Sequence, residues 1–127
     1  MLFRSRLVVP DASDSDLAID VQHSRYEDLL EAGVKIYETH DEILHSKSAV
    51  IDGVWSVIGS SNFDHRSVLF NDEVDAVVVG TDTAKELEAL FTKDFAAAHR
   101  IELAVWRERP FSQKIREIFA RLTQQML

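Results

Sequence analysis

The sequence predicts an α/β fold in which a mixed β-sheet is flanked by helices. Short β-rich runs alternate with stretches whose apolar residues recur at helical spacing, which is the pattern of a layered α/β domain. Two of the β-rich runs, at residues 43–51 and 54–58, are separated by Asp52-Gly53, the preferred dipeptide of a two-residue type I′ hairpin. The length of 127 residues and the apolar share of 46% suit one domain with a core of ordinary size.

The first third of the chain predicts a strand, a helix and a second strand. Residues 3–9 form a β-rich run that a proline ends. A helix is predicted next, capped at Ser13 or Asp14 and running to residue 32, where a glycine supplies the stop. Residues 34–38 alternate between apolar and polar side chains, which predicts a short strand.

After the hairpin, the sequence predicts one more strand and two helices. The strand covers residues 73–79, and a capping box, Thr83-x-x-Glu86, begins a helix that runs to about residue 99. Residues 111–126 place their apolar side chains on one helical stripe, which predicts an amphipathic C-terminal helix. We therefore expect one folded domain over residues 1–106 and a basic amphipathic helix within residues 107–127.

The charge of the chain is acidic and unevenly distributed. The formal net charge is −8, yet residues 107–127 hold five basic and two acidic residues, a local net of +3, so the rest of the chain carries −11. The negative charge of residues 1–106 argues against sequence-independent electrostatic binding of nucleic acid, and no nucleic-acid partner is expected. The absence of cysteine excludes disulfides and thiolate metal sites.

The predicted hairpin brings polar side chains of both strands to one face of the sheet. With Asp52-Gly53 as a two-residue turn, Lys47 opposes Ile58 and His45 opposes Ser60. Side chains alternate along a strand, and opposed residues share a face. The sequence therefore predicts that His45, Lys47 and Ser60 lie together.

The polar side chains on this face suit a bound oxyanion such as a phosphate. Asn62 joins them if the extended path continues, and Lys47 adds a positive charge to the directed hydrogen-bond donors. His45 is placed to attack phosphorus or to transfer a proton. Glu73, at the start of the next strand, can hydrogen-bond the far nitrogen of His45 and so fix its tautomer.

Simpler interpretations apply to some of these residues. A His-x-Lys pair alone on a strand more often lies on a solvent-exposed face without a function. The polar residues across the hairpin are what favour a functional site here. His40 and His45 are five residues apart and fall on opposite faces of a strand, so a shared metal ion is not expected, and no cofactor is predicted. Trp55 alternates onto the face opposite Lys47 and is expected in the core.

The residues around the hairpin form a specific string. His45-x-Lys47-x4-Asp52 is followed by Gly59-Ser60-x-Asn62 and then by Asn71-Asp72-Glu73-Val74. This string resembles the C-terminal catalytic half of the phospholipase D superfamily, and within it bacterial cardiolipin synthases, from about Leu7 to the end of the chain. The paired motifs are highly specific, so the resemblance also implies the fold of a phospholipase D-like half-domain.

The resemblance implies a metal-independent, two-step phosphatidyl transfer through a phosphohistidine. One histidine attacks phosphorus, and the histidine of a second His-x-Lys-x4-Asp motif acts as acid and base; by analogy His45 is the acid and base. Lys47 and Asn62 would hold phosphate oxygens with help from Ser60, and Glu73 would orient His45. The other motif residues are expected to be structural: Asp52, Gly53 and Gly59.

The sequence departs from the family pattern in two ways. It contains one motif, whereas the family's site needs two, so the second motif must come from an upstream half or from another copy in a homodimer. Position 65 is histidine where relatives often carry tryptophan. His65 has no lysine two residues later, so it is not expected to be the missing catalytic histidine.

The leading hypothesis is an enzyme of cardiolipin-synthase type, which joins two phosphatidylglycerols and releases glycerol. Two alternatives stay open: a one-motif phosphodiesterase or nuclease acting as a homodimer, and an inactive isolated half-domain. The C-terminal helix either packs on its own domain or lies on an anionic membrane surface. We expect the chain at the bacterial cytoplasmic membrane, either peripheral or attached through segments upstream of residue 1.

Overall fold

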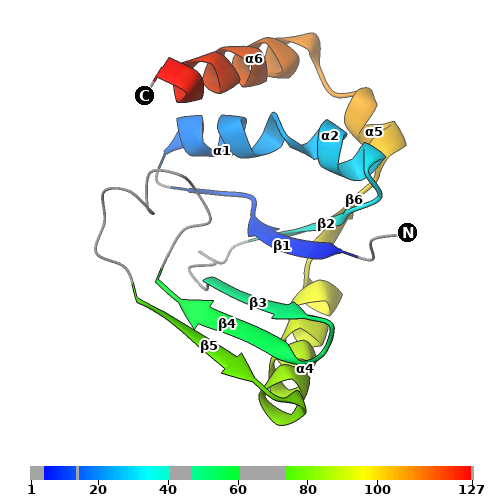
Figure 1. Ribbon diagram of the computed structural model, residues 1–127. Coiled ribbons are helices and arrows are strands. Elements are labelled where there is room, and N and C mark those ends of the chain that lie inside the picture. The colour runs from blue at the N-terminus through cyan, green and yellow to red at the C-terminus, as the bar shows by residue number, and fades with distance from the viewer. Residues whose placement is uncertain (1–4, 14, 41–46, 61–73, 127) are drawn as a thin grey trace. The chain divides into compact units, whose positions relative to one another are not determined.

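The computed structural model describes residues 5–13, 15–40, 47–60 and 74–126, and it confirms the predicted α/β class (Figure 1). The chain divides into two compact units, which are described separately. Unit 1 comprises Met1–Leu44 and Ala97–Leu127, and unit 2 comprises His45–Ala96. Each unit contains a three-stranded sheet, so the described strands form two small sheets where the sequence predicted one.

Unit 1 is built on a mixed sheet in the order β1-β2-β6. Its strands are β1 (Arg6–Pro10), β2 (Lys35–Thr39) and β6 (His99–Ile101). β1 and β2 are parallel, whereas β2 and β6 are antiparallel. The helices of this unit are α1 (Asp16–His23), α2 (Tyr26–Glu31), α5 (Leu103–Arg107) and α6 (Phe111–Met126).

The connection between β1 and β2 contains two helices where the sequence predicted one. α1 begins after Ser15, later than the predicted caps, and α2 begins after Arg25. Between them the hydroxyl of Ser24 donates a hydrogen bond to the carbonyl of Val21 at 2.6 Å. Serine side chains compete in this way with the backbone bonds of a helix, which accounts for a break at this position.

The core of unit 1 lies between the sheet and the helices α1, α2 and α5. Its buried side chains are Tyr26, Ile36 and Ile101. Half-buried apolar side chains pack around them: Val9, Leu29, Leu30, Val34 and Trp106. The core therefore joins residues from both ends of the chain, since β6 and α5 follow unit 2 in sequence.

A polar network borders this core. The Tyr26 hydroxyl donates to Oε1 of Glu38 at 2.7 Å, and Nε2 of His23 lies 2.9 Å from the same oxygen. Burial raises the pKa of the Tyr26 phenol well above its ordinary value, and the Glu38 carboxylate raises it further. Burial also opposes ionisation of Glu38, but the hydrogen bonds from His23 and Tyr26 outweigh it and lower the pKa of that carboxyl. The network ties α1 and α2 to β2.

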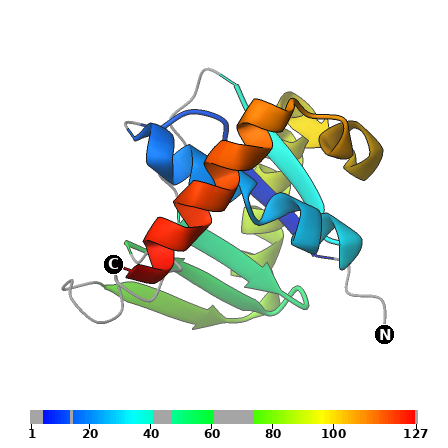
Figure 2. The same cartoon turned by 90° about the horizontal axis from the view of Figure 1, so that it is seen from above.

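α6 lies along α1 and contacts it through its polar side (Figure 2). On this side of α6, Glu117 pairs with Arg109 of the α5–α6 connection; their side chains are 3% and 11% exposed, and Nη2 lies 2.9 Å from Oε2. Two more ion pairs reach α1 and α2, Arg116–Asp20 at 3.7 Å and Arg121–Asp28 at 3.3 Å. The basic tail thus faces the acidic helices, which explains the uneven charge of the sequence.

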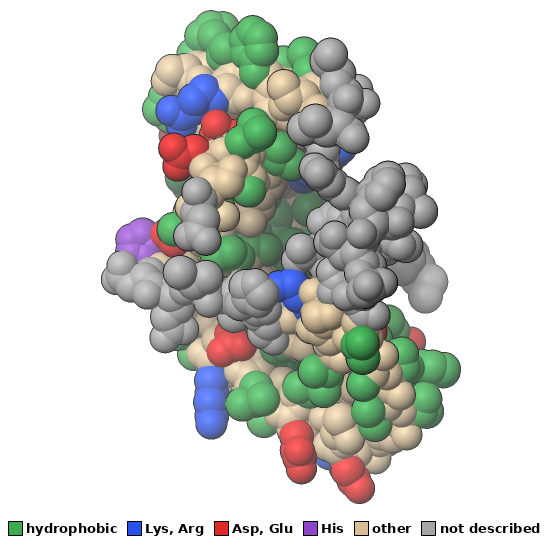
Figure 3. All heavy atoms as spheres, turned by 90° about the vertical axis from the view of Figure 1, so that its left-hand side faces the viewer, with side chains coloured by type: hydrophobic (Ala, Val, Ile, Leu, Met, Phe, Trp, Pro, Cys, Tyr) green, Lys and Arg blue, Asp and Glu red, His purple; other side chains and the backbone are tan. Residues whose placement is uncertain are grey.

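The apolar stripe of α6 faces away from α1. Its described members are exposed: Phe111 76%, Ile115 39%, Ile118 60%, Phe119 66% and Leu122 53%. Ala120, on the opposite side of the helix, is buried. Apolar side chains gather accordingly at the top of Figure 3. Of the two alternatives left open for this helix, it does pack on unit 1, but through its polar side and not through the apolar stripe.

Unit 2 consists of an antiparallel sheet and one long helix. Its elements are β3 (Lys47–Ile51), β4 (Trp55–Gly59), β5 (Asp75–Val79) and α4 (Thr81–Ala97). β4 is the central strand, and α4 begins before the predicted capping box at Thr83. Among the described residues of the unit, Ser56 on β4 and Ala84 on α4 are fully buried, so α4 covers the face of the sheet that holds Ser56. No helix among the described residues has the length and apolarity needed to cross a bilayer.

Candidate active site

The structure describes part of the predicted site. Within the described residues lie Lys47, Asp52, Gly53, Gly59 and Ser60. His45, Asn62 and Glu73 lie outside the described residues, as does His65, and their roles stay predictions. In the part of the chain that is described, no three His, Asp or Glu side chains are grouped as a metal site requires.

The hairpin between β3 and β4 turns at Asp52-Gly53. Both residues have positive φ, 53° and 63°, and the amide of Val54 donates to the carbonyl of Ile51 at 3.2 Å. These are the features of a type I′ turn. Aspartate tolerates the left-handed conformation better than most residues, and glycine adopts it without steric cost. The backbone alone therefore accounts for both residue types at the turn.

The pairing of β3 with β4 differs by one residue from the predicted register. Lys47 lies opposite Gly59, not opposite Ile58, because Val54 is an extra residue between the turn and the ladder. The carbonyl of Val54 accepts a hydrogen bond from the amide of Gly80 at 2.8 Å, which draws it toward the end of β5. A shift of one residue exchanges the two faces of a strand.

The corrected register changes which side chains share the face of Lys47. Trp55 now lies on that face and is 50% exposed, so the prediction that it belongs to the core is wrong. Ser56 lies on the other face and is fully buried. The position opposite Ser60 in this register falls outside the described residues.

Ser60 holds the end of β4 against the start of β5. Its amide donates to the carbonyl of Val74 at 3.1 Å, and its hydroxyl oxygen accepts from the amide of Val74 at 3.1 Å. These two bonds extend the ladder by one residue pair beyond Gly59 and Asp75. The Ser60 hydroxyl thus has a structural contact in addition to the phosphate contact that the sequence predicts.

A residue that the sequence reasoning did not consider, Asp75, lies in the same row of the sheet as Lys47. Gly59 is opposite Lys47 on β3 and opposite Asp75 on β5, so these three residues form one row across the sheet. Opposed residues point to the same face, which places the Asp75 carboxyl on the face of Lys47. The sequence carried a signal for it, because Asp75 is two residues after Glu73 and strand side chains repeat every two residues.

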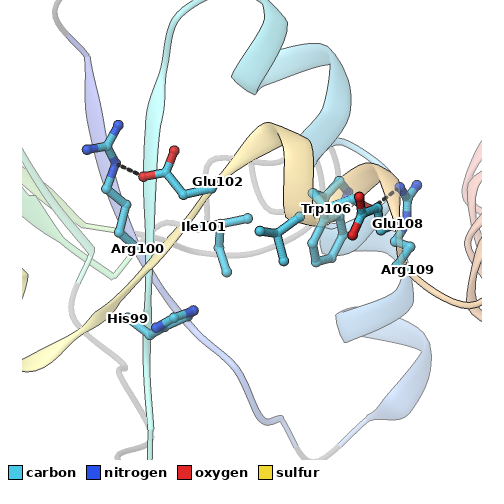
Figure 4. A pocket seen from close by; sticks show the side chains of 8 residues that line it. His99, Arg100, Ile101, Glu102, Trp106, Glu108 and Arg109 are labelled. Carbon is cyan, nitrogen blue, oxygen red and sulfur yellow. Dashed lines mark hydrogen bonds and ion pairs between the residues drawn. The ribbon is translucent and has the colours of Figure 1, made fainter.

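Unit 1 contains a cavity of about 530 Å³ between β6 and α5 (Figure 4). Its walls are formed by His99, Arg100, Ile101, Glu102, Val105, Trp106, Glu108 and Arg109. Nε of Arg100 lies 3.0 Å from Oε1 of Glu102, and Nη1 of Arg109 donates to the carbonyl of Trp106 at 2.9 Å. The described motif residues are absent from these walls, so the cavity is not part of the predicted site.

Comparison with known proteins points to one family. The family model described as "Cardiolipin synthase, PLD-like domain" matches residues 3–95, which include both motifs. No solved structure is significantly similar to the chain.

Over the aligned region, curated relatives are identical to this chain at about a third to two fifths of the positions. The cardiolipin synthase of Geobacillus sp. (strain WCH70) is 38% identical over 122 residues, which are 96% of this chain and 24% of the relative. Cardiolipin synthase A of Serratia proteamaculans is 34% identical over 111 residues, 87% of this chain and 23% of the relative. Cardiolipin synthase 1 of Staphylococcus epidermidis (strain ATCC 12228 / FDA PCI 1200) is 36% identical over 121 residues, which are 95% of this chain and 25% of the relative. The chain spans about a quarter of the length of these relatives.

Proposed function

The chain belongs to the family of cardiolipin synthase, PLD-like domains, and we propose that it supplies one of the two His-Lys motifs of a phosphatidyl transferase. The reaction would join two phosphatidylglycerols into cardiolipin and release glycerol. The observation that carries this proposal is the continuous family match over residues 3–95, because it includes the complete His-x-Lys-x4-Asp and Gly-Ser-x-Asn motifs. The curated relatives of the same region are named cardiolipin synthases.

In the proposed mechanism, one histidine nitrogen attacks the phosphorus of a first phosphatidylglycerol. The new N–P bond forms as the P–O bond to glycerol breaks, and the second histidine protonates the departing oxygen. That histidine then takes the proton from a hydroxyl of a second phosphatidylglycerol, whose oxygen attacks phosphorus and releases the first histidine. By the family analogy His45 is the acid and base, and splitting the transfer into two steps lowers each barrier.

The other motif residues would bind and orient the phosphate. Lys47 and Asn62 hold its nonbridging oxygens, and Ser60 assists, since the phosphate gains negative charge at these oxygens in the transition state. Glu73 fixes the tautomer of His45. The placement of Lys47 on β3 of a three-stranded sheet supports this role, because a strand positions a binding residue more precisely than a loop does.

The second motif would come from an upstream half or from a second copy of the chain. A homodimer would place two copies of His45 at one site, and an upstream half would supply a different histidine. The proposed location is the bacterial cytoplasmic membrane, where the lipid substrate resides. Neither a metal nor another cofactor enters this mechanism.

The proposal predicts selective action on phosphatidylglycerol. Purified chain would be sized by sedimentation and incubated with vesicles of phosphatidylglycerol, with bis(p-nitrophenyl) phosphate and with DNA. An assembly with two motifs is expected to form cardiolipin and release glycerol, and vesicles of phosphatidylcholine are the control because that lipid lacks an acceptor hydroxyl. Faster cleavage of DNA would favour the nuclease alternative. A monomer that leaves phosphatidylglycerol unchanged would identify an inactive half-domain.

We also propose that the outward stripe of α6 contacts the membrane surface. The stripe is apolar, and the one acidic residue of α6, Glu117, is buried on the opposite side. Arg116 and Arg121 stand at the edges of the stripe with side chains 66% and 42% exposed, and their guanidinium groups pair with Asp20 and Asp28 of the neighbouring helices. An interfacial helix with apolar and basic residues so arranged binds anionic bilayers.

Replacing Ile118 and Phe119 by serine should weaken binding to phosphatidylglycerol vesicles at least about tenfold, since two large side chains no longer enter the interface. Vesicle flotation or sedimentation measures the loss. Leu90→Ser is the matched control, because Leu90 is 52% exposed on another helix. Point substitutions are sharper than deletion of residues 110–127, which would also remove the buried Glu117 carboxylate from Arg109. Equal vesicle binding by the double variant and the unchanged chain would contradict the proposal.

A further inference from the structure

We propose that two ion pairs form an electrostatic latch on α6, and that anionic lipid headgroups compete for the arginines of these pairs. The pairs are Arg116–Asp20, which joins α6 to α1, and Arg121–Asp28, which joins it to α2. This inference rests on the proposed contact between α6 and the membrane surface. It adds a means by which the rest of unit 1 controls that contact.

The first observation is that the apolar core of unit 1 contains no described side chain of α6. The helix lies along α1, and its buried residues are Glu117 and Ala120, 3% and 2% exposed (Figure 2). The large apolar side chains of α6 stand on the opposite side and are exposed. Burial of apolar side chains, which provides most of the stability of an ordinary docked helix, therefore contributes little to the attachment of α6.

The second observation is that the surfaces in contact carry opposite charge. α1 and α2 contain five acidic residues and neither lysine nor arginine, whereas α6 contains three basic residues and one acidic residue. That acidic residue, Glu117, is paired with Arg109. The ammonium of Lys114 donates to the carbonyl of Arg107 at 2.7 Å. Arg116 and Arg121 are thus the cations that α6 directs at the acidic helices.

The third observation is that both pairs of the latch are accessible from solvent. The side chains of Arg116 and Arg121 are 66% and 42% exposed, and the nitrogen–oxygen distances are 3.7 Å and 3.3 Å. An exposed pair of this kind changes an equilibrium by no more than about fivefold. The buried pair of Arg109 and Glu117 lies outside the latch, because it joins α6 to the preceding connection and not to α1 or α2.

An anionic bilayer offers these arginines a partner of similar strength. An arginine close to such a surface strengthens binding about fivefold, which equals the upper value for an exposed ion pair. Arg116 and Arg121 stand at the edges of the apolar stripe, so they approach the headgroups when the stripe enters the interface. Exchanging a carboxylate for a lipid phosphate therefore costs little. Until that exchange occurs, Asp20 and Asp28 weaken the attraction of α6 to the membrane.

The test compares two double variants that remove equal charge. Asp20→Asn, Asp28→Asn opens the latch and is the latch variant. Asp16→Asn, Glu86→Gln removes two charges from exposed positions outside the two pairs and is the control variant. In flotation with phosphatidylglycerol vesicles, the latch variant should bind about three- to tenfold more tightly than the control variant, because two exposed pairs no longer compete. Equal or weaker binding by the latch variant would overturn the proposal.

Hydrogen exchange locates the effect without lipid. An isolated helix of 16 residues is marginally stable in water, so release of α6 exposes its amides to exchange. The amides of residues 111–126 should exchange faster in the latch variant than in the control variant, whereas α4 should exchange equally in both. High salt screens exposed pairs and should accelerate exchange of α6 in the unchanged chain. If neither the substitutions nor salt changes the exchange of α6, the two pairs do not hold the helix and the proposal is wrong.

The variant Ile118→Ser, Phe119→Ser separates this inference from the membrane contact on which it rests. If that variant loses vesicle binding while the latch variant equals its control, the contact stands and the latch is refuted. If the latch variant binds more tightly while loss of the two apolar side chains has no effect, the arginines bind lipid without the stripe, and the proposed contact is refuted. Neither result depends on turnover of phosphatidylglycerol.

Discussion

Replacing His45 by alanine should greatly slow phosphatidyl transfer in any assembly that carries both motifs. Under the proposed mechanism this histidine protonates the leaving glycerol and then deprotonates the incoming hydroxyl, so both steps lose their acid or base. General acid–base catalysis contributes about 10²- to 10⁴-fold, and we expect kcat to fall by that factor. Cardiolipin formation from phosphatidylglycerol vesicles measures the effect.

His40→Ala is the matched control for this experiment. The His40 side chain is 84% exposed and pairs with Asp11, in a part of unit 1 that the motif does not include. Its loss should leave kcat within about a factor of two, the usual range for a surface substitution. Activity that survives in His45→Ala at the level of the unchanged chain would show that the site is assigned to the wrong residues.

Replacing Glu117 by alanine should destabilise unit 1 by up to about 3–5 kcal/mol, the cost of breaking a buried ion pair by removing one partner. Arg109 contacts both oxygens of Glu117, with Nε at 3.2 Å from each and Nη2 at 2.9 Å from Oε2. After the substitution this guanidinium would stay buried beside Trp106 with Glu27 as its remaining carboxylate, at 3.3 Å. Urea unfolding followed by tryptophan fluorescence measures the change.

The exposed pair on the same helix supplies the comparison. Arg116 lies 3.7 Å from Asp20 with its side chain 66% exposed, and Arg116→Ala should cost no more than about 1 kcal/mol. The double variant Arg109→Met, Glu117→Leu removes both buried charges and should recover most of the lost stability. If Glu117→Ala unfolds at the same urea concentration as the unchanged chain, the pair does not hold α6 in place.

The turn of the β3–β4 hairpin was predictable, and its register was not. Asp52-Gly53 fixes a type I′ turn through local backbone preferences, which depend on those two residues alone. The register depends on Val54, whose carbonyl is held by the amide of Gly80 at the far end of β5. That contact joins residues distant in sequence, so no local pattern signals it. Because the predicted register was off by one residue, it placed every side chain of β4, including that of Trp55, on the wrong face of the sheet.

The C-terminal helix shows a similar limit. The spacing of its apolar residues predicts an amphipathic helix, and the structure has that helix. Periodicity does not say which side packs inward. The packed side carries Glu117, which pairs with Arg109, and Arg109 reaches Glu27 only once α5 and α6 lie beside α2. The break between α1 and α2 likewise depends on one hydroxyl, that of Ser24.

The φ of 53° at Asp52 bears on how the motif is searched for in other sequences. Histidine and lysine stand in the pattern for what their side chains do, but the aspartate stands at a position whose dihedral angles favour Asp, Asn or Gly. A search that insists on a carboxylate there treats a conformational preference as a chemical requirement. Sequences with asparagine or glycine directly after the motif's four variable residues are compatible with the same turn, and they belong among the candidates that such a search would discard.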